Sequence, residues 1–477
     1  MKAPVIATAT AVALLAVAAG LFAGPRPPSL DDAPTGDAAL AARVRDAAGD
    51  PAGFRALSVV SVENGTVRYA GLGDGAVTPD TPFEIGSVTK TLTGMLLADL
   101  EQDGVLSARD TLGTLLPGTE GPAASITAEE LTSHRAGLPR LPPMNLASLL
   151  LRQTRGADPY AGITTADIAR GLSQTGELDG RGEFAYSNYG VSALGLALAT
   201  RAGTPYPRLV SDRILTPLGM NDTVFTLDGA GPPPGATAGG TPAGRATAPW
   251  TASGIAPAGA GAWSTAADLG RLLTALLAGT APGQAATTAR FDAGPNERVG
   301  YGWLTRDSSI VWHNGGTGGF SSWVGFDRAT GRGVAVLGNT TRSVDPIGLR
   351  LLGADPPAAT RAPAEWATTA VTVFLLLSGA SLFTTAVRRR SDRLHLTEAA
   401  LIAAGCLALV HRTGDWLIIP SWLWAVALGL SAAGAVVAAL TWRGRPTLRD
   451  ATKATTRWVS LAVSAVLAIA LAAMVLS

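Results

Sequence analysis

Lysine is rare in this sequence, and one lysine stands three residues after a serine, far from the hydrophobic ends of the chain. The chain contains only Lys2, Lys90 and Lys453, alongside many arginines. A lysine in a partly desolvated site can act as a base or lower the pKa of a neighbour, whereas arginine keeps its proton. Lys90 would therefore be a candidate base one helical turn from Ser87, an arrangement suited to nucleophilic attack by the serine hydroxyl. The alternative explanation is that a serine stands three residues before Lys90 by chance and has no catalytic role.

A second cluster of candidate residues contains Tyr186 and Asn188. Tyrosine is normally a poor base because its pKa is about 10, but an adjacent ammonium group would stabilise the phenolate and lower that pKa. Paired with Lys90, Tyr186 could then take the proton from Ser87. We expect Asn188 to hydrogen-bond either an amide carbonyl of a substrate or the Lys90 side chain. The alternative is that Tyr186 is an ordinary aromatic residue that leads into the next helix.

A third cluster is a glycine-rich segment, residues 312–320, which follows a predicted strand. Its glycines would let a substrate lie against the strand edge, and the N–H groups of Gly316 and Ser87 could form an oxyanion hole. His313 stands near the start of this segment, although a lone histidine is more often structural than catalytic. No lysine follows the glycines, which excludes a phosphate-binding loop, and no His-Glu-x-x-His zinc motif occurs. The predicted chemistry requires neither a metal ion nor another cofactor.

The elements that must position these clusters are strands from both ends of one domain. Two β-rich runs flank Asn64-Gly65, a dipeptide that favours a tight hairpin turn. Apolar residues at helical spacing predict that Gly86 and Ser87 open a helix. The predicted strands are residues 56–62, 66–70, 299–304, 309–313, 320–326 and 333–337, and the predicted helices are residues 37–48, 87–102, 166–174, 191–201 and 266–277. This order indicates an α+β fold in which the terminal strands share one antiparallel β-sheet, flanked by helices, with a mostly helical insertion.

Hydrophobic segments at both ends of the chain predict membrane attachment. Residues 1–24 contain an apolar run that is typical of a signal peptide or an N-terminal membrane anchor, and residues 25–36 read as a linker. Further apolar runs predict a four-helix transmembrane region over residues 364–477. These runs are residues 366–387, 394–410, 417–442 and 458–476. Residues 37–355, between the two ends, are assigned to a single large domain.

Basic residues in the loops between the apolar runs predict the orientation in the membrane. Cytoplasmic loops are enriched in lysine and arginine, and such residues cluster after the first and third C-terminal runs. They are Arg388, Arg389, Arg390, Arg393, Arg443, Arg445, Arg449, Lys453 and Arg457. We therefore expect residues 24–365 to lie outside the cytoplasm, with the lipid bilayer of the cell membrane as a partner. The net charge of +1, without a basic cluster outside these loops, argues against a nucleic-acid partner.

Taken together and in order, the three clusters resemble the motifs of a known enzyme family. Ser-Val-Thr-Lys at residues 87–90, Tyr-Ser-Asn at 186–188 and His-Asn-Gly at 313–315 are similar to the three motifs of the penicillin-recognising serine hydrolases. The subgroup is that of class C β-lactamases, serine DD-carboxypeptidases and related esterases. The resemblance covers roughly residues 40–350 and implies a serine β-lactamase/DD-peptidase-like fold.

The resemblance also implies a role for each motif residue. Ser87 would be the nucleophile. The other roles would fall to the proton-transfer pair Lys90 and Tyr186, to the substrate-binding residues Asn188, His313 and Gly315, and to the oxyanion-hole amides of Ser87 and Gly316. Class C β-lactamases carry lysine where this chain has His313, and a neutral histidine binds a substrate carboxylate less strongly than an ammonium group. A DD-carboxypeptidase or an esterase is therefore expected rather than a true β-lactamase.

These inferences predict a membrane-anchored, extracytoplasmic serine hydrolase that acts through an acyl-enzyme on Ser87. Its substrate would be a small molecule or a peptidoglycan peptide of the D-Ala-D-Ala type, and the scissile bond would belong to an amide, a β-lactam or an ester. The alternative is a penicillin-binding receptor that is acylated but turns over poorly and signals through its transmembrane helices, because the resemblance does not extend to those helices.

Overall fold

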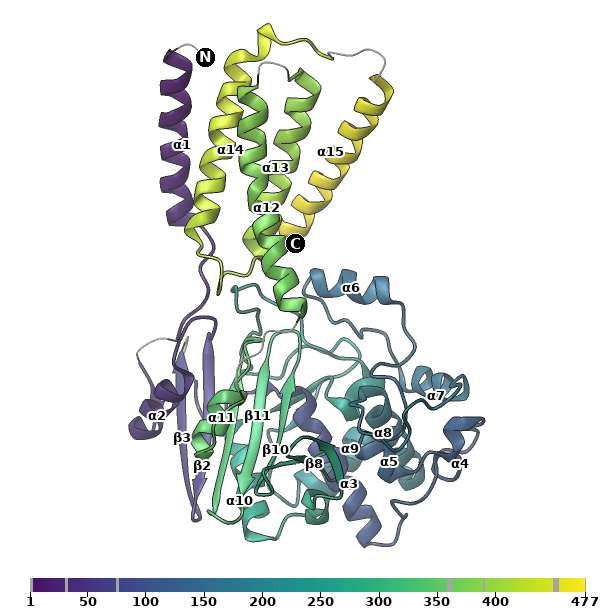
Figure 1. Cartoon of the computed structure of the whole chain (residues 1–477). Coiled ribbons are helices and arrows are strands. Elements are labelled where there is room, and N and C mark those ends of the chain that lie inside the picture. The colour runs from purple at the N-terminus through teal and green to yellow at the C-terminus, as the bar shows by residue number, and fades with distance from the viewer. Residues whose placement is uncertain are drawn as a thin grey trace. The chain divides into compact units, whose positions relative to one another are not determined.

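The computed structural model divides the chain into two compact units. It describes residues 3–30, 33–73, 77–357, 363–388, 391–448 and 454–476. The larger unit consists of residues 29–241 and 246–357. The smaller unit consists of residues 1–28, 242–245 and 358–477. Figure 1 shows the strands in the larger unit and the long apolar helices in the smaller one.

An antiparallel sheet of nine strands lies at the centre of the larger unit (Figure 1). Its strands are β1 (Thr35–Gly36), β2 (Ala56–Glu63), β3 (Thr66–Gly73), β7 (Phe291–Gly294), β8 (Glu297–Val299), β9 (Leu304–Arg306), β10 (Ile310–Gly316), β11 (Ser321–Asp327) and β12 (Arg332–Gly338). Their order in space is β1-β3-β2-β12-β11-β10-β9-β8-β7. β2 pairs with β12, with Val59 opposite Val336, so the predicted sharing of one sheet by the terminal strands is confirmed.

The helices of the larger unit come mainly from the segment between β3 and β7. They are α2 (Ala38–Ala48), α3 (Thr89–Gln102), α4 (Leu112–Leu115), α5 (Ala128–Thr132), α6 (Leu146–Thr154), α7 (Thr165–Ser173), α8 (Asn188–Ala202), α9 (Tyr206–Val210), α10 (Ala266–Ala278) and α11 (Asp345–Leu352), with the shorter turns η1 (Gly86–Val88), η2 (Pro122–Ser125), η3 (Ser211–Leu215), η4 (Ser253–Ala258) and η5 (Gln284–Thr287). The predicted helical insertion is therefore present. η1 runs directly into α3, as the prediction of a helix that opens at Gly86 and Ser87 requires.

Both faces of the nine-stranded sheet are covered by helices. Residues that alternate along a strand point to opposite faces of a sheet, and on β2 they enter two different hydrophobic clusters. Val60 packs in the cluster that contains Leu92 of α3 and Leu272 of α10. Val59, its neighbour, packs in the cluster that contains Val44 of α2 and residues of α11. The strands are consequently apolar on both faces rather than on one.

One predicted strand is wrong, because residues 299–304 contain the turn between β8 and β9. Gly302 has φ +71°, in the left-handed region that favours glycine. A Cβ atom on Gly302 would lie 2.2 Å from the Lys90 carbonyl oxygen, so this turn packs tightly against α3. A second sheet was not predicted, since its strands are too short to show alternation. That sheet consists of β4 (Phe83–Glu84), β6 (Ala262–Ser264) and β5 (Val224–Phe225).

The smaller unit consists of long apolar helices. They are α1 (Ala3–Ala23), α12 (Pro363–Val387), α13 (Arg393–Thr413), α14 (Trp422–Thr441), the short turn η6 (Trp442–Gly444) and α15 (Ala454–Leu476). Among the described residues, four helices are long and apolar enough to cross a membrane, namely α1, α12, α13 and the helix from Trp422 to Gly444. The transmembrane span predicted at residues 458–476, in α15, is not among these four and stays a prediction. α1 packs closely on α14, since a Cβ atom on Gly20 would lie 2.8 Å from the Ala425 Cα atom.

The orientation predicted from the basic loops stays a prediction. Arg389, Arg390, Arg449 and Lys453 lie outside the described residues.

Arg457 forms an ion pair of 3.6 Å with Glu398, the acidic residue inside the second C-terminal run. A carboxylate among apolar helices is costly unless it is paired, so this contact accounts for an acid in a helix whose middle is apolar.

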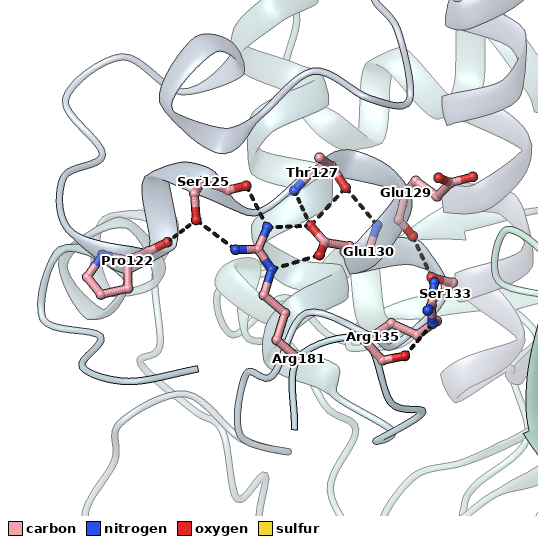
Figure 2. A network of polar contacts seen from close by, with 9 residues as sticks. Pro122, Ser125, Thr127, Glu129, Glu130, Ser133, Arg135 and Arg181 are labelled. Carbon is pink, nitrogen blue, oxygen red and sulfur yellow. Dashed lines mark hydrogen bonds and ion pairs between the residues drawn. The ribbon is translucent and has the colours of Figure 1, made fainter. Parts of the chain in front are cut away.

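Arg181 ties two short helices of the insertion together (Figure 2). Its guanidinium donates to both carboxylate oxygens of Glu130, at 2.7 and 2.8 Å, and to the carbonyl and hydroxyl oxygens of Ser125. Glu130 also caps the start of α5 by accepting from the Thr127 backbone at 2.8 Å. Burial alone would raise the pKa of Glu130, but the hydrogen bonds from Arg181 and Thr127 outweigh it and hold that pKa below its usual value.

We expect Arg181→Met to lower the free energy of unfolding of the larger unit by about 2 kcal/mol, because a half-buried carboxylate loses two charge-assisted hydrogen bonds. The control is Arg170→Met, which removes an exposed ion pair with Asp167 and should cost less than about 0.5 kcal/mol. Denaturant unfolding of the two variants, followed by circular dichroism, measures both effects. A depressed carboxyl pKa stabilises the fold above its unfolded value of 4.5. The Arg181 effect should therefore shrink as the pH falls below that value, and equal costs for the two variants would contradict the assignment.

Candidate active site

Ser87 and Lys90 are in hydrogen-bond contact where α3 begins. Ser87 lies in η1 and Lys90 in the first turn of α3, so the two side chains share one helical face. Lys90 Nζ lies 2.7 Å from Ser87 Oγ and donates a hydrogen bond of 2.7 Å to the Ala258 carbonyl oxygen. Ala258 is the last residue of η4, so a segment 168 residues later in the chain fixes the position of the amine.

The surroundings of Lys90 favour the neutral amine. Its side chain is fully buried, and burial, followed by the positive charge of Arg140, lowers the pKa of Lys90 well below its usual value. No carboxylate in the described part of the chain forms an ion pair with it. A neutral amine beside a serine hydroxyl can accept the hydroxyl proton.

Tyr186 lies beside both residues, but its pKa moves in the direction opposite to the prediction. Burial raises the pKa of Tyr186 to about 12, although a hydrogen bond with Ser87 and the charge of Arg140 oppose the rise. The predicted lowering required an ammonium group at Lys90, and burial disfavours that charged form. Lys90 Nζ nevertheless lies 4.9 Å from the centre of the Tyr186 ring. Tyr186 is therefore protonated near neutral pH and can donate a proton rather than accept one.

His134 fixes the segment that carries Tyr186. The Ser187 backbone N–H donates to His134 Nδ1 at 3.2 Å, and the ring centres of His134 and Tyr186 are 4.5 Å apart. Burial and, secondarily, Lys90 lower the pKa of His134 well below its usual value, so the neutral ring accepts this hydrogen bond. The Ser187 hydroxyl then caps α8 by accepting from the Gly190 N–H at 2.8 Å. Asn188 is the first residue of this helix.

The glycine-rich end of β10 passes close to Ser87. A Cβ atom on Gly315 would lie 2.1 Å from the Ile85 carbonyl oxygen and 3.0 Å from the Ser87 nitrogen, so a side chain there would collide with the backbone before α3. Gly316 follows and lines the same cavity as Ser87. The two predicted oxyanion-hole residues are thus neighbours, although 228 residues separate them in the chain. Their role stays a prediction.

His313 is buried and does not line the cavity that Gly315 lines. Burial, with a smaller effect from Lys90, lowers the pKa of His313 to about 3, so the imidazole is neutral at ordinary pH. Its ring centre lies 6.3 Å from that of Tyr186. Direct contact of His313 with a substrate stays a prediction, and its burial favours an indirect effect through Tyr186.

Most of the predicted site residues, although not Lys90 or His313, line a cavity of about 490 Å³ within the larger unit. Ser87, Tyr186, Asn188, Gly315 and Gly316 line it, together with Asn314, Thr317 and Phe320 of the same glycine-rich segment. Its wall also includes residues that the sequence did not indicate, among them Arg140, Tyr160, Trp250 and Asp345. Asn188 Oδ1 is buried and has no hydrogen-bond partner among the described residues. An unsatisfied buried acceptor is costly, and this one belongs to a residue on the cavity wall.

Glu84 is a further residue that the sequence reasoning missed. It precedes Ser87 by three residues, and its carboxyl group accepts hydrogen bonds from Thr317 Oγ1 at 2.6 Å and from the Trp250 N–H at 2.8 Å. Burial raises the pKa of Glu84 to about 7, although these two hydrogen bonds act to lower it. Glu84 therefore links the segment before the serine to the end of the glycine-rich strand. Its partners are far away in the sequence, so no local pattern could have indicated this contact.

The sequence matches a known protein family along most of the larger unit. A family profile described as Beta-lactamase matches residues 10–354, which is more than half of the chain. The chain belongs to the β-lactamase family. The predicted membership of the penicillin-recognising serine hydrolases is thereby confirmed, and residues 10–354 of this family member include all three motifs.

Individual relatives of this β-lactamase-family protein match over shorter stretches. Beta-lactamase-like protein 2 of Dictyostelium discoideum is 31% identical over 162 residues, which is 32% of this chain and 28% of that protein. The D-alanyl-D-alanine-carboxypeptidase/endopeptidase AmpH of Escherichia coli strain K12 is 31% identical over 153 residues, which is 31% of this chain and 37% of that protein. The chain thus spans about a third of the length of these curated relatives.

Solved structures of the family share the fold of the larger unit. A β-lactamase/D-alanine carboxypeptidase from Pseudomonas syringae has a TM-score of 0.57 at 19% identity, covering 67% of this chain and 100% of that chain. A class C β-lactamase from Rhodobacter sphaeroides has a TM-score of 0.54 at 22% identity, covering 64% and 95%. The predicted serine β-lactamase-like α+β fold is confirmed by these likenesses.

We expect Lys90→Arg to abolish hydrolysis nearly as completely as Lys90→Ala, because a guanidinium cannot become neutral in the buried site. Loss of a general base typically lowers the rate by about 10²–10⁴-fold. Steady-state kcat/KM on a chromogenic ester, with circular dichroism to establish folding, measures the effect. A folded Lys90→Arg variant with near-normal activity would contradict the assignment of Lys90 as the general base.

The pH dependence should follow Lys90 and not a histidine. Because the pKa of Lys90 is lowered, kcat/KM should fall as the pH decreases through that lowered value and the amine gains a proton. His313, with a pKa of about 3, is already neutral above about pH 4 and should add no inflection near 6.5. The measurement is the pH profile of kcat/KM for the natural chain and for His313→Gln. If kcat/KM no longer fell at low pH in His313→Gln, the histidine and not the lysine would control the pH dependence.

Proposed function

We propose that this protein is a membrane-anchored, extracytoplasmic serine hydrolase that forms an acyl-enzyme on Ser87. The observation that carries the proposal is the contact of the buried Lys90 amine with Ser87 Oγ, at 2.7 Å, in a position fixed by the Ala258 carbonyl oxygen. Burial lowers the pKa of Lys90 and so favours its neutral, basic form. A serine hydroxyl alone is a weak nucleophile at neutral pH, and an adjacent base activates it. The cavity beside Ser87 provides room for an acyl donor.

In the proposed reaction Ser87 Oγ attacks the carbonyl carbon of the acyl donor and its proton moves to Lys90 Nζ. The N–H groups of Ser87 and Gly316 would stabilise the tetrahedral oxyanion. When the bond to the leaving group breaks, the Tyr186 hydroxyl donates its proton to the leaving group and is reprotonated by the Lys90 ammonium. Water then attacks the acyl carbon and gives its proton to Lys90. Tyr186 donates a proton to Ser87 Oγ and is again reprotonated by Lys90, so Ser87 is regenerated and the acid is released. The raised pKa of Tyr186 supports the donor role.

The chemistry of the third motif supports a DD-carboxypeptidase or an esterase rather than a true β-lactamase. His313 is buried and neutral, so it supplies no ammonium at the position where class C β-lactamases carry lysine. One relative is described as a D-alanyl-D-alanine-carboxypeptidase/endopeptidase, which is consistent with a peptidoglycan peptide as substrate.

The location proposed for the enzyme rests on its apolar helices and on the charge of their loops. α1 precedes the larger unit, and α12, α13 and α14 follow it. Arg388, Arg393, Arg443 and Arg445 lie at or between the helix ends that the positive-inside rule would place in the cytoplasm. That orientation leaves the larger unit, with Ser87, on the outside of the cell membrane.

Ser87→Ala should abolish covalent labelling by a fluorescent fluorophosphonate and lower the hydrolysis of a short ester by about 10³-fold or more, because the attacking oxygen is removed. Ser192→Ala is the control, since Ser192 is a buried serine of α8 outside the three motifs. In-gel fluorescence and release of the alcohol measure the two effects. Unchanged labelling of Ser87→Ala would disprove the proposal, and stoichiometric labelling without turnover would favour the receptor alternative.

A further inference from the structure

The wall of the active-site cavity carries one positively charged side chain, that of Arg140, among the residues that line it. The side chain is solvent-exposed. Within the described part of the chain, no carboxylate lies within ion-pair distance of its guanidinium, and no acceptor takes a hydrogen bond from it. A guanidinium has five N–H donors in a planar fork that matches the geometry of a carboxylate. Arg140 therefore presents an anion-binding group without an anion partner from the protein.

Backbone contacts fix Arg140 next to the second motif. Its carbonyl oxygen accepts hydrogen bonds from the N–H groups of Asn188, at 2.9 Å, and of Tyr189, at 3.3 Å. Its guanidinium carbon lies 5.1 Å from the centre of the Tyr186 ring. The preceding carbonyl, that of Pro139, accepts from the Ser187 hydroxyl at 2.6 Å. The start of α8 thus holds the charge on the side of the cavity formed by the helical insertion.

The side of the cavity formed by the sheet offers an acid instead of a cation. Asp345, the first residue of α11, accepts a hydrogen bond of 2.6 Å from Asn314 Nδ2, and both residues line the cavity. His313, the neighbouring residue on β10, is buried and outside the cavity lining. A carboxylate on a substrate would therefore find no positive charge along β10.

We propose that Arg140 is the specificity-determining residue of this cavity and that the preferred acyl donor carries a carboxylate that binds to its guanidinium. The proposal rests on the proposed acyl transfer to Ser87. Bidentate guanidinium–carboxylate contacts are stronger than neutral hydrogen bonds and fix orientation. The carboxylate lies beside Tyr186 and Asn188, so it belongs to the part of the substrate that contacts the helical insertion rather than β10.

The test compares two reversible inhibitors that differ by one carboxylate. Phenylboronic acid and 3-carboxyphenylboronic acid both form a boron–oxygen bond with an activated serine. Each is titrated against fluorophosphonate labelling of the full-length, detergent-solubilised protein. We expect the carboxylated compound to protect at about tenfold lower concentration, which corresponds to one charge-assisted hydrogen-bonded contact. Arg140→Gln should remove this advantage, whereas Arg140→Lys should retain part of it.

Two controls separate this inference from the proposed function. Arg109→Gln removes the same charge from an exposed arginine outside the cavity and should keep the tenfold advantage. Phenylboronic acid is titrated on each variant as its own reference, because loss of the Arg140 charge changes the pKa of Lys90 and affects both inhibitors alike. The ratio of the two protective concentrations then reports the guanidinium–carboxylate contact alone. Equal protection by both compounds in the natural chain, or an advantage that survives Arg140→Gln, would overturn the role of Arg140. Labelling that does not depend on Ser87 would instead refute the proposed function.

Discussion

The burial of the Lys90 amine is the physical constraint on which the rest of the site depends. A lysine in apolar surroundings is stable only when it loses its charge or finds a partner, and here a serine hydroxyl and the Ala258 carbonyl take the place of a carboxylate. Burial likewise raises the pKa of Tyr186, so the tyrosine keeps its proton. Burial also lowers the pKa of His134 and of His313, so Lys90 and the two imidazoles can lie close together without repelling one another as cations.

The two layers of the fold contribute different things to the cavity. The sheet contributes backbone, since Gly315 must approach the Ile85 carbonyl more closely than any side chain would permit. The helical insertion contributes side chains, with Tyr186 at the entry to α8 and Arg140 held by the same helix start. Glu84 joins the two layers through Thr317 and Trp250. A shift of either layer would therefore change the geometry of the cavity without changing any residue that lines it.

The sequence was sufficient to predict what depends on local spacing, and insufficient where distant segments decide. The proximity of Lys90 to Ser87 follows from helical periodicity, and the pairing of β2 with β12 follows from strands at both ends of one domain. The pKa of Tyr186 could not be predicted, because it depends on how deeply distant segments of the chain bury the ring. Residues 299–304 have the apolar pattern of a strand, but Gly302 adopts a left-handed conformation against α3 and the segment turns there.

The pairing of β2 with β12 has a consequence for the order of events in biosynthesis. A polypeptide leaves the ribosome N-terminus first, and long-range strand pairing is slow because a large loop must close before its contacts form. β12 ends at Gly338, whereas α1 ends at Ala23, so the first apolar helix emerges long before the central sheet can close. Ser87 therefore remains without Gly315 and Gly316 until nearly the whole larger unit has been translated. The cavity beside Ser87 is thus one of the last parts of the larger unit that can form.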